Sequence, residues 1–357
     1  MTLSIIMLLV FDGYIANKFI DSSLIPGLRL FIFIWIPLTA IHSIYSEVFR
    51  AYHNIKYASI FSSGTAFGGF SSGWVIGGVL LLAYIYNVDV ELEYLYQLIL
   101  GVTFLFIIVE TFLLMNIISY SEFENIQDEI KLNIWPLIKQ AFPFFISILS
   151  FILIIHADTI ILGFYRGEDE VALYSTSTRI AKLVFTSIII VNEVIAPIIV
   201  KLNAENNFER LEKILRLSAT FAAIVSTVLI SFLVLFSEYL LGSLYGEYYV
   251  AGAPLLIILG LGQLISVWAG SSSFALSMMG YQVIGMYISI TTSLIALIAC
   301  ILLAEPYGAQ AIAVIISSAW IFQNVISLLF LRKLSGFWAH AGVLYSLKEV
   351  KAYLRKS

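Results

Sequence analysis

Apolar runs long enough to cross a lipid bilayer recur along almost the whole sequence. A helix needs about 20 residues to cross roughly 30 Å of hydrocarbon, and in lipid every backbone polar group must find its partner inside the protein. An α-helix satisfies its own backbone within one segment. The sequence therefore predicts an all-α polytopic transmembrane protein with ten spans, over residues 2–17, 24–46, 58–86, 95–119, 142–164, 171–200, 217–236, 251–279, 283–303 and 309–331.

The composition agrees with this prediction and excludes several classes of protein. Hydrophobic residues make up 61% of the chain and charged residues 12%, with a mean hydropathy of +0.98. The net charge of −4 is spread over the loops, so no basic patch indicates nucleic-acid binding. The single cysteine, Cys300, excludes an intramolecular disulfide and makes a thiolate metal cluster implausible.

Motifs of covalent chemistry are missing from the sequence. It contains no G-x-x-x-x-G-K-[ST], H-E-x-x-H or G-x-S-x-G pattern. The loops predicted on the outer side are too short to form a catalytic domain, which argues against a membrane enzyme such as a polysaccharide polymerase. We therefore expect a protein that is not an enzyme and that uses no cofactor or metal.

Lysine and arginine orient the predicted spans, because loops rich in these residues stay in the cytoplasm. Of the 19 cations, fourteen fall in the loops and tail on one side and three in the opposite loops, while Arg179 and Lys182 lie inside a span. Both termini are therefore expected in the cytoplasm.

A polar interruption divides the spans into two groups. It covers residues 120–136, with EFENIQDEIK at its centre, and is predicted to be a cytoplasmic linker. The expected organisation is an N-terminal lobe over 1–119 with four helices, a C-terminal six-helix lobe over 137–333, and a tail over 334–357 that lies along the cytoplasmic surface.

Charged residues inside the hairpin formed by the runs at 142–164 and 171–200 are the main candidates for function. Ionisable side chains in a membrane span are costly, and they commonly mark a pathway for substrate or ions. Asp158 and Arg179 are predicted at similar depth below the outer turn. They either form a salt bridge that only fixes the hairpin, or Arg179 and Lys182 bind a phosphate-bearing substrate with Asp158 as their counter-charge.

Three further carboxylates are candidates for ion coupling. Glu193 lies one turn before Pro197 near the inner end of its span, and it is either a protonatable coupling residue or a side chain that reaches the membrane interface. Asp12 and Glu110, in the first and fourth spans, are weaker candidates with the same two interpretations.

The same hairpin resembles a known family. HADTIILGFYRGEDEVALYSTSTRIAKLVF, followed by the segment 193–202 and ERLEKILRLSATF, is similar to the seventh to ninth helices of polysaccharide flippases of the multidrug/oligosaccharidyl-lipid/polysaccharide (MOP) exporter superfamily. An aspartate, a glycine-containing turn, a tyrosine and a proline recur there, and they correspond to Asp158, Gly163 with Gly167, Tyr174 and Pro197.

This resemblance implies a two-lobed bundle in the bacterial inner membrane that flips undecaprenyl-diphosphate-linked oligosaccharide for O-antigen, capsule or exopolysaccharide synthesis. It implies H⁺ or Na⁺ as coupling ion, a role for Arg179 and Lys182 in holding the diphosphate, and contact with other polysaccharide-assembly membrane proteins. The alternative within the superfamily is a cation-coupled multidrug antiporter, whose substrates favour an acidic cavity.

The sequence departs from the family pattern at its N-terminus. The family has twelve or more spans, and the first four runs here correspond to its third to sixth helices. The first two helices therefore have no counterpart, as expected for a truncated reading frame, a split gene, a reduced paralogue or a non-transporting remnant.

Overall fold

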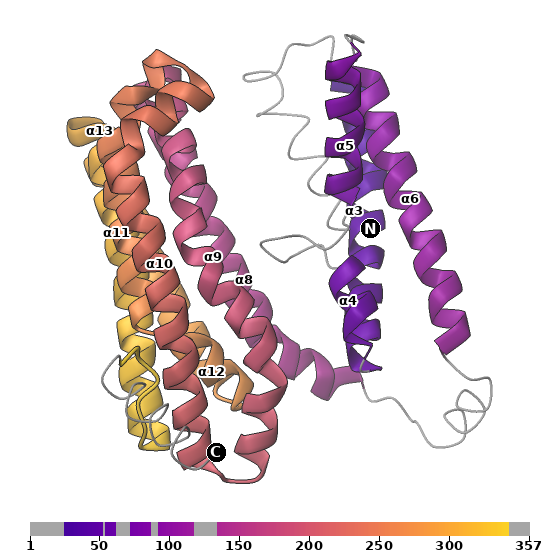
Figure 1. The fold of residues 1–357 in the computed structure, drawn as a ribbon, viewed down its shortest axis with the longest axis vertical. Helices are drawn as coiled ribbons and strands as arrows, with labels where there is room; N and C mark the ends of the chain where they lie inside the picture. The colour runs from indigo at the N-terminus through magenta and orange to yellow at the C-terminus, as the bar shows by residue number, and fades with distance from the viewer. Residues whose placement is uncertain (1–24, 53, 62–71, 87–91, 118–133, 343–357) are drawn as a thin grey trace. The chain divides into compact units, whose positions relative to one another are not determined.

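The computed structural model describes residues 25–52, 54–61, 72–86, 92–117 and 134–342. All elements assigned in these segments are helices, which confirms the all-α prediction (Figure 1). The chain divides into two compact units, Met1–Leu132 and Asn133–Ser357. Six of the described helices are long and apolar enough to cross a membrane. The protein is thus a multi-pass helical membrane protein.

The described part of the N-terminal unit contains four helices. They are α3 (Ile25–Ala51), α4 (Ile55–Phe61), α5 (Ser72–Ile85) and α6 (Leu92–Ile117), and α3 packs on α4 and α6. Phe49, Phe61 and Leu114 form the core where these three helices meet, and the ring of Phe106 meets that of Phe61 edge-on at 5.9 Å. The predicted span at 2–17 lies outside the described residues.

The C-terminal unit is a bundle of long helices. It contains α8 (Ile134–Arg166), α9 (Glu168–Ala204), α10 (Phe208–Tyr245), the 3-10 helix η2 (Glu247–Gly252), α11 (Ala253–Trp268), α12 (Ser272–Met278) and α13 (Gln282–Ser335). Helix α8 packs mainly on α13, whereas α9 packs on α10 and α11. The predicted run at 251–279 is therefore split among η2, α11 and α12.

The last two predicted spans correspond to the two halves of α13, which are two helices on either side of a kink. Gly308 separates them with φ 63° and ψ −151°, two residues after Pro306. The backbone amide of Ala309 donates to Glu170 Oε2 at 3.0 Å, and Arg166 Nε lies 3.3 Å from Glu170 Oε1. Because the kink leaves amides without intrahelical acceptors, the carboxylate of Glu170 caps the second half of α13.

The chain folds back against the bundle after α13. Gly336, at φ 81°, ends the helix, and residues 336–342 form a segment that we call the strap. Its Ala341 amide donates to the carbonyl of Trp268 at 3.0 Å, and its Gly342 amide donates to Thr220 Oγ1 at 2.9 Å. Buried strap residues include Phe337 and Ala339. This part of the expected surface tail is thus packed inside the C-terminal unit.

Candidate functional site

Asp158 lies at the centre of a buried polar network between α8 and α9. Only 3% of the side chain is exposed, and Tyr174, fully buried on α9, donates its hydroxyl to Asp158 Oδ2 at 2.6 Å. Thr159 donates to Oδ1 from its backbone amide at 2.5 Å and from its hydroxyl at 3.1 Å. These donors compensate for the loss of water around a buried carboxyl group.

The predicted pairing of Asp158 with Arg179 is not what the structure contains. Helix α8 continues to Arg166 and α9 begins at Glu168, so the turn between them is Gly167 alone, at φ 83°. This tight turn sets the rotation of α9 and places Tyr174, rather than Arg179, opposite Asp158. The sequence predicted a longer turn, between the runs at 142–164 and 171–200, and therefore predicted the wrong depth for Arg179 relative to Asp158.

Arg179, Lys182 and Glu193 lie together on the exposed face of α9. Helical positions are 100° apart, so these residues, with Pro197 farther along, fall within about 60° of one another around the helix axis. We call this face the α9 stripe. Its two cations lie one turn apart, and Glu193 follows them after about 17 Å along the helix. The C-terminal unit itself leaves this stripe uncovered.

The two cations of the stripe differ in their relation to Asp158. Lys182 is close enough to act electrostatically on that carboxyl group. Neither Arg179 nor Lys182 forms an ion pair with another residue that the structure describes. An arginine and a lysine one turn apart offer several N–H donors to a phosphate group.

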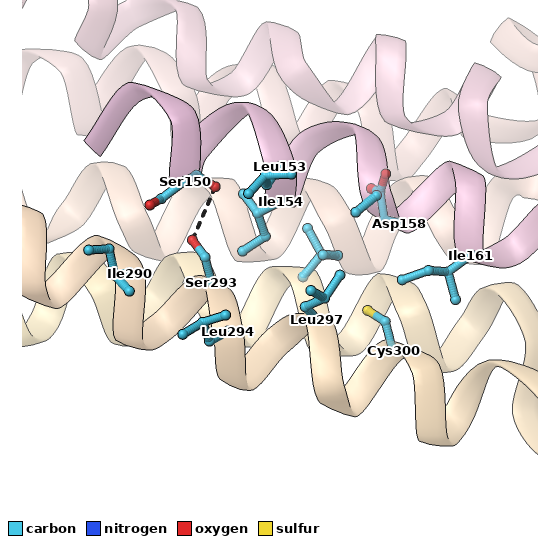
Figure 2. A pocket seen from close by; sticks show the side chains of 12 residues that line it. Ser150, Leu153, Ile154, Asp158, Ile161, Ile290, Ser293, Leu294, Leu297 and Cys300 are labelled. Atoms are coloured by element: carbon cyan, nitrogen blue, oxygen red, sulfur yellow. Dashed lines mark hydrogen bonds between the residues drawn. The ribbon is translucent and has the colours of Figure 1, made fainter. Parts of the chain in front are cut away.

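A cavity of about 130 Å³ opens between α8 and α13, and Asp158 lines it (Figure 2). Its other walls are mostly apolar, with Ile154 and Leu297 among them, and Asp158 is the charged residue among those that line it. The hydroxyl of Ser293 donates to the carbonyl of Ser150 at 3.2 Å and so joins the two helices beside the cavity. Cys300 contributes its thiol to the same wall. The cavity wall thus includes one acidic residue, whose carboxylate is bonded to Tyr174 and Thr159.

Glu110 is also buried, but in the N-terminal unit. Its side chain is fully buried on α6, and its Oε1 lies 2.8 Å from Nδ1 of His42 on α3. The sequence predicted Glu110 as a candidate and gave no partner for it. His42 was missed, although a histidine within an apolar run is itself a signal of a buried polar contact. Asp12 lies outside the described residues.

Comparisons with known proteins agree with this architecture. The family model MatE matches residues 143–302, which include the whole hairpin from Pro143 to Pro197. No curated protein matches the chain.

Solved structures share the fold over nearly the whole chain. A MATE point mutant has a TM-score of 0.69 at 14% identity, covering 94% of this chain and 75% of that one. A MOP superfamily transporter from Pyrococcus furiosus has a TM-score of 0.68 at 13% identity, with the same coverage. A MATE in complex with MaL6 has a TM-score of 0.69 at 15% identity, covering 94% of this chain and 76% of the other. The chain thus has the fold of the MATE transporters.

Proposed function

We propose that this protein is a membrane transporter that flips a lipid-linked oligosaccharide, carried on a diphosphate, from the inner to the outer leaflet of the bacterial cytoplasmic membrane. The observation that carries this proposal is the α9 stripe, where Arg179 and Lys182 lie one turn apart on a face that their own unit leaves open. A charged headgroup crosses the membrane interior only if cations replace its water, and a pair of basic residues supplies them.

Coupling to an ion gradient is the second part of the proposal. Asp158 lines an apolar cavity and has Tyr174 as its partner on α9, so gain or loss of a proton or Na⁺ there acts directly on the packing of α8 against α9. Glu193 is the alternative coupling residue, on the α9 stripe itself. The distribution of lysine and arginine supports cytoplasmic termini, as inferred from the sequence.

A cation-coupled multidrug antiporter is the second candidate. The observation that favours it is Asp158, an acidic group in an otherwise apolar cavity, which suits an organic cation. Four of the structures with this fold bear MATE names, and the Pyrococcus furiosus transporter is described as having a binding pocket of reverse polarity that suggests a different function. Pocket polarity therefore separates the two candidates, and the two cations of the α9 stripe favour an anionic substrate.

Complementation of a flippase-deficient strain tests the proposal. Arg179→Ala and Lys182→Ala should abolish surface polysaccharide while the protein still inserts into the membrane. Lys201→Ala is the matched control, because Lys201 is an exposed cation at the inner end of the same helix, 4.0 Å from Glu205. Normal polysaccharide in the Arg179 and Lys182 variants rejects the phosphate role, and drug resistance that depends on Asp158 supports the antiporter instead.

A further inference from the structure

The N-terminal unit contains a buried ionisable pair that the proposed transport path does not use. His42 on α3 is 2% exposed and Glu110 on α6 is 0% exposed, and His42 Nδ1 lies 2.8 Å from Glu110 Oε1. The imidazole also packs edge-on against Phe106, with ring centroids 6.2 Å apart. A histidine and a glutamate that exclude water in this way interact strongly, because nothing screens their charges.

Apart from their contact with each other, the two side chains have no hydrogen-bond partner among the described residues. His42 Nε2 and Glu110 Oε2 are both buried, and no residue that the structure describes accepts from or donates to them. A buried polar atom without a partner is costly, and a pair that served only to join two helices would be expected to satisfy both ends. A water molecule or a further donor and acceptor would satisfy these two atoms.

The number of protons held by the pair decides its net charge. With one proton between the two side chains, the pair is neutral overall, whether the proton resides on the imidazole or on the carboxyl group. Removal of that proton leaves a net negative charge in an apolar core, and addition of a second leaves a net positive one. Both changes are costly without water.

We propose that His42 and Glu110 form a proton-binding site in the N-terminal unit, whose ligand is a single proton and whose exchange alters the packing of α3 on α6. The site lies in a different unit from Asp158, so it adds to the coupling residues proposed above and does not depend on the identity of the transported substrate.

Other titratable groups that the structure describes on α3 and α4 have partners of their own or lie at the surface. On α3, Glu47 Oε1 lies 3.5 Å from Arg50 Nη1 at an exposed position, and on α4 Lys56 is exposed. Tyr45, one turn from His42, accepts a hydrogen bond from the hydroxyl of Thr111 at 3.3 Å, next to Glu110 in sequence. Tyr57 packs against Phe49 in the core of the unit. The described part of α5 contains no charged residue. Among the residues that the structure describes, the pair is therefore the buried ionisable contact between α3 and α6.

The test follows His42 directly, in the purified full-length protein in lipid nanodiscs and without substrate. Replacement of the other three histidines, as His53→Asn, His156→Asn and His340→Asn, leaves His42 as the sole imidazole signal in a nuclear magnetic resonance titration. The pair itself is unchanged in this background. Infrared spectra of the same sample report whether a protonated carboxyl group is present at each pH.

A proton-binding site predicts that the His42 signal titrates and that Glu110→Gln, which removes the negative partner, lowers the proton affinity of His42 at least tenfold. A His42 signal that stays in one protonation state over the whole pH range in which the protein is folded overturns the proposal. So does a Glu110→Gln midpoint within twofold of the parent.

If Glu110→Gln does not fold, the proposal is tested with the protein that carries only the three histidine substitutions. The carboxyl band and the His42 signal must then change together with pH, and independence of the two overturns the proposal. None of these outcomes bears on the substrate, so a failure here is distinct from a failure of the α9 stripe.

Discussion

The hydroxyl of Tyr174 donates to Asp158 Oδ2 at 2.6 Å, and this bond joins α9 to α8 inside the C-terminal unit. Tyr174 is fully buried and Asp158 nearly so, and Tyr174 is the hydrogen-bond partner of Asp158 on α9. Binding of a proton or a cation to Asp158 would therefore alter its hydrogen bond with Tyr174 and so the packing of α9, the helix that also carries Arg179 and Lys182.

Tyr174→Phe removes this bond while keeping the ring. Because hydrogen bonds to charged groups contribute about 1.5–3 kcal/mol, the variant should unfold at a clearly lower temperature. Tyr248→Phe is the control, since the Tyr248 hydroxyl donates to the carbonyl of Asp169 at 3.2 Å at an exposed site and its loss should cost less than about 0.5 kcal/mol. Thermal unfolding in detergent measures both, and equal melting temperatures for Tyr174→Phe and the parent contradict the assignment.

Asp158→Asn tests the coupling role. Asparagine keeps an oxygen that accepts from Tyr174, but its NH₂ group cannot accept from Thr159, and it can neither exchange a proton nor supply a negative charge. Gradient-driven transport in vesicles should fall at least tenfold. If Asp158→Asn transports normally while Glu193→Gln does not, the coupling residue is Glu193.

Gly308→Ala tests the kink of α13. A Cβ atom there would lie 2.5 Å from Glu170 Oε2 and 2.8 Å from Arg166 Nε, and the residue has a positive φ of 63°. Displacement of the Glu170 cap together with backbone strain should cost about 1–3 kcal/mol in unfolding free energy. Gly163→Ala is the control, because its Cβ would make an ordinary contact at 3.5 Å with Val171. Comparable stability of the two variants argues against the cap.

The strap predicts a protected site after α13. In a Cys300→Ala background, the thiol of Ala341→Cys should react with a water-soluble maleimide at least tenfold more slowly than that of Lys333→Cys, because Ala341 is 6% exposed and Lys333 is at the surface. Addition of Gly270→Ala should release it, since a Cβ there would fall 2.2 Å from the carbonyl oxygen of Ala339. Equal labelling rates at the two positions would show that the strap does not stay packed.

Hydropathy alone was sufficient to predict the helical class and most of the long helices. The run at 171–200, for example, lies within α9. Its limits appear where neighbouring runs meet. Residues 283–303 and 309–331 are two spans by composition and lie in the two halves of α13, but their junction at Gly308 depends on Glu170 at the start of α9, which satisfies the amide of Ala309. The composition of an apolar run does not predict such a long-range partner.

Candidate residues were easier to predict than their partners. Asp158, Arg179 and Glu110 are charges in apolar runs and are visible at once. Their partners Tyr174 and His42 could not be predicted from the sequence. The position of Tyr174 depends on the rotation of α9 after a one-residue turn at Gly167. The position of His42 depends on the contact of α3 with α6, which are not consecutive in the sequence. The rotation of a helix and its choice of neighbouring helix are fixed by side-chain packing, which the hydrophobic periodicity of the sequence does not specify.

Movement of a fluorescent diphosphate-linked glycolipid between leaflets of reconstituted vesicles tests the central claim most directly. The account predicts ion-gradient-dependent flipping by the parent and by Lys201→Ala, with at least tenfold slower flipping by Arg179→Ala and Lys182→Ala. An absence of flipping by the parent, together with export of an organic cation that both substitutions leave unchanged, would contradict it.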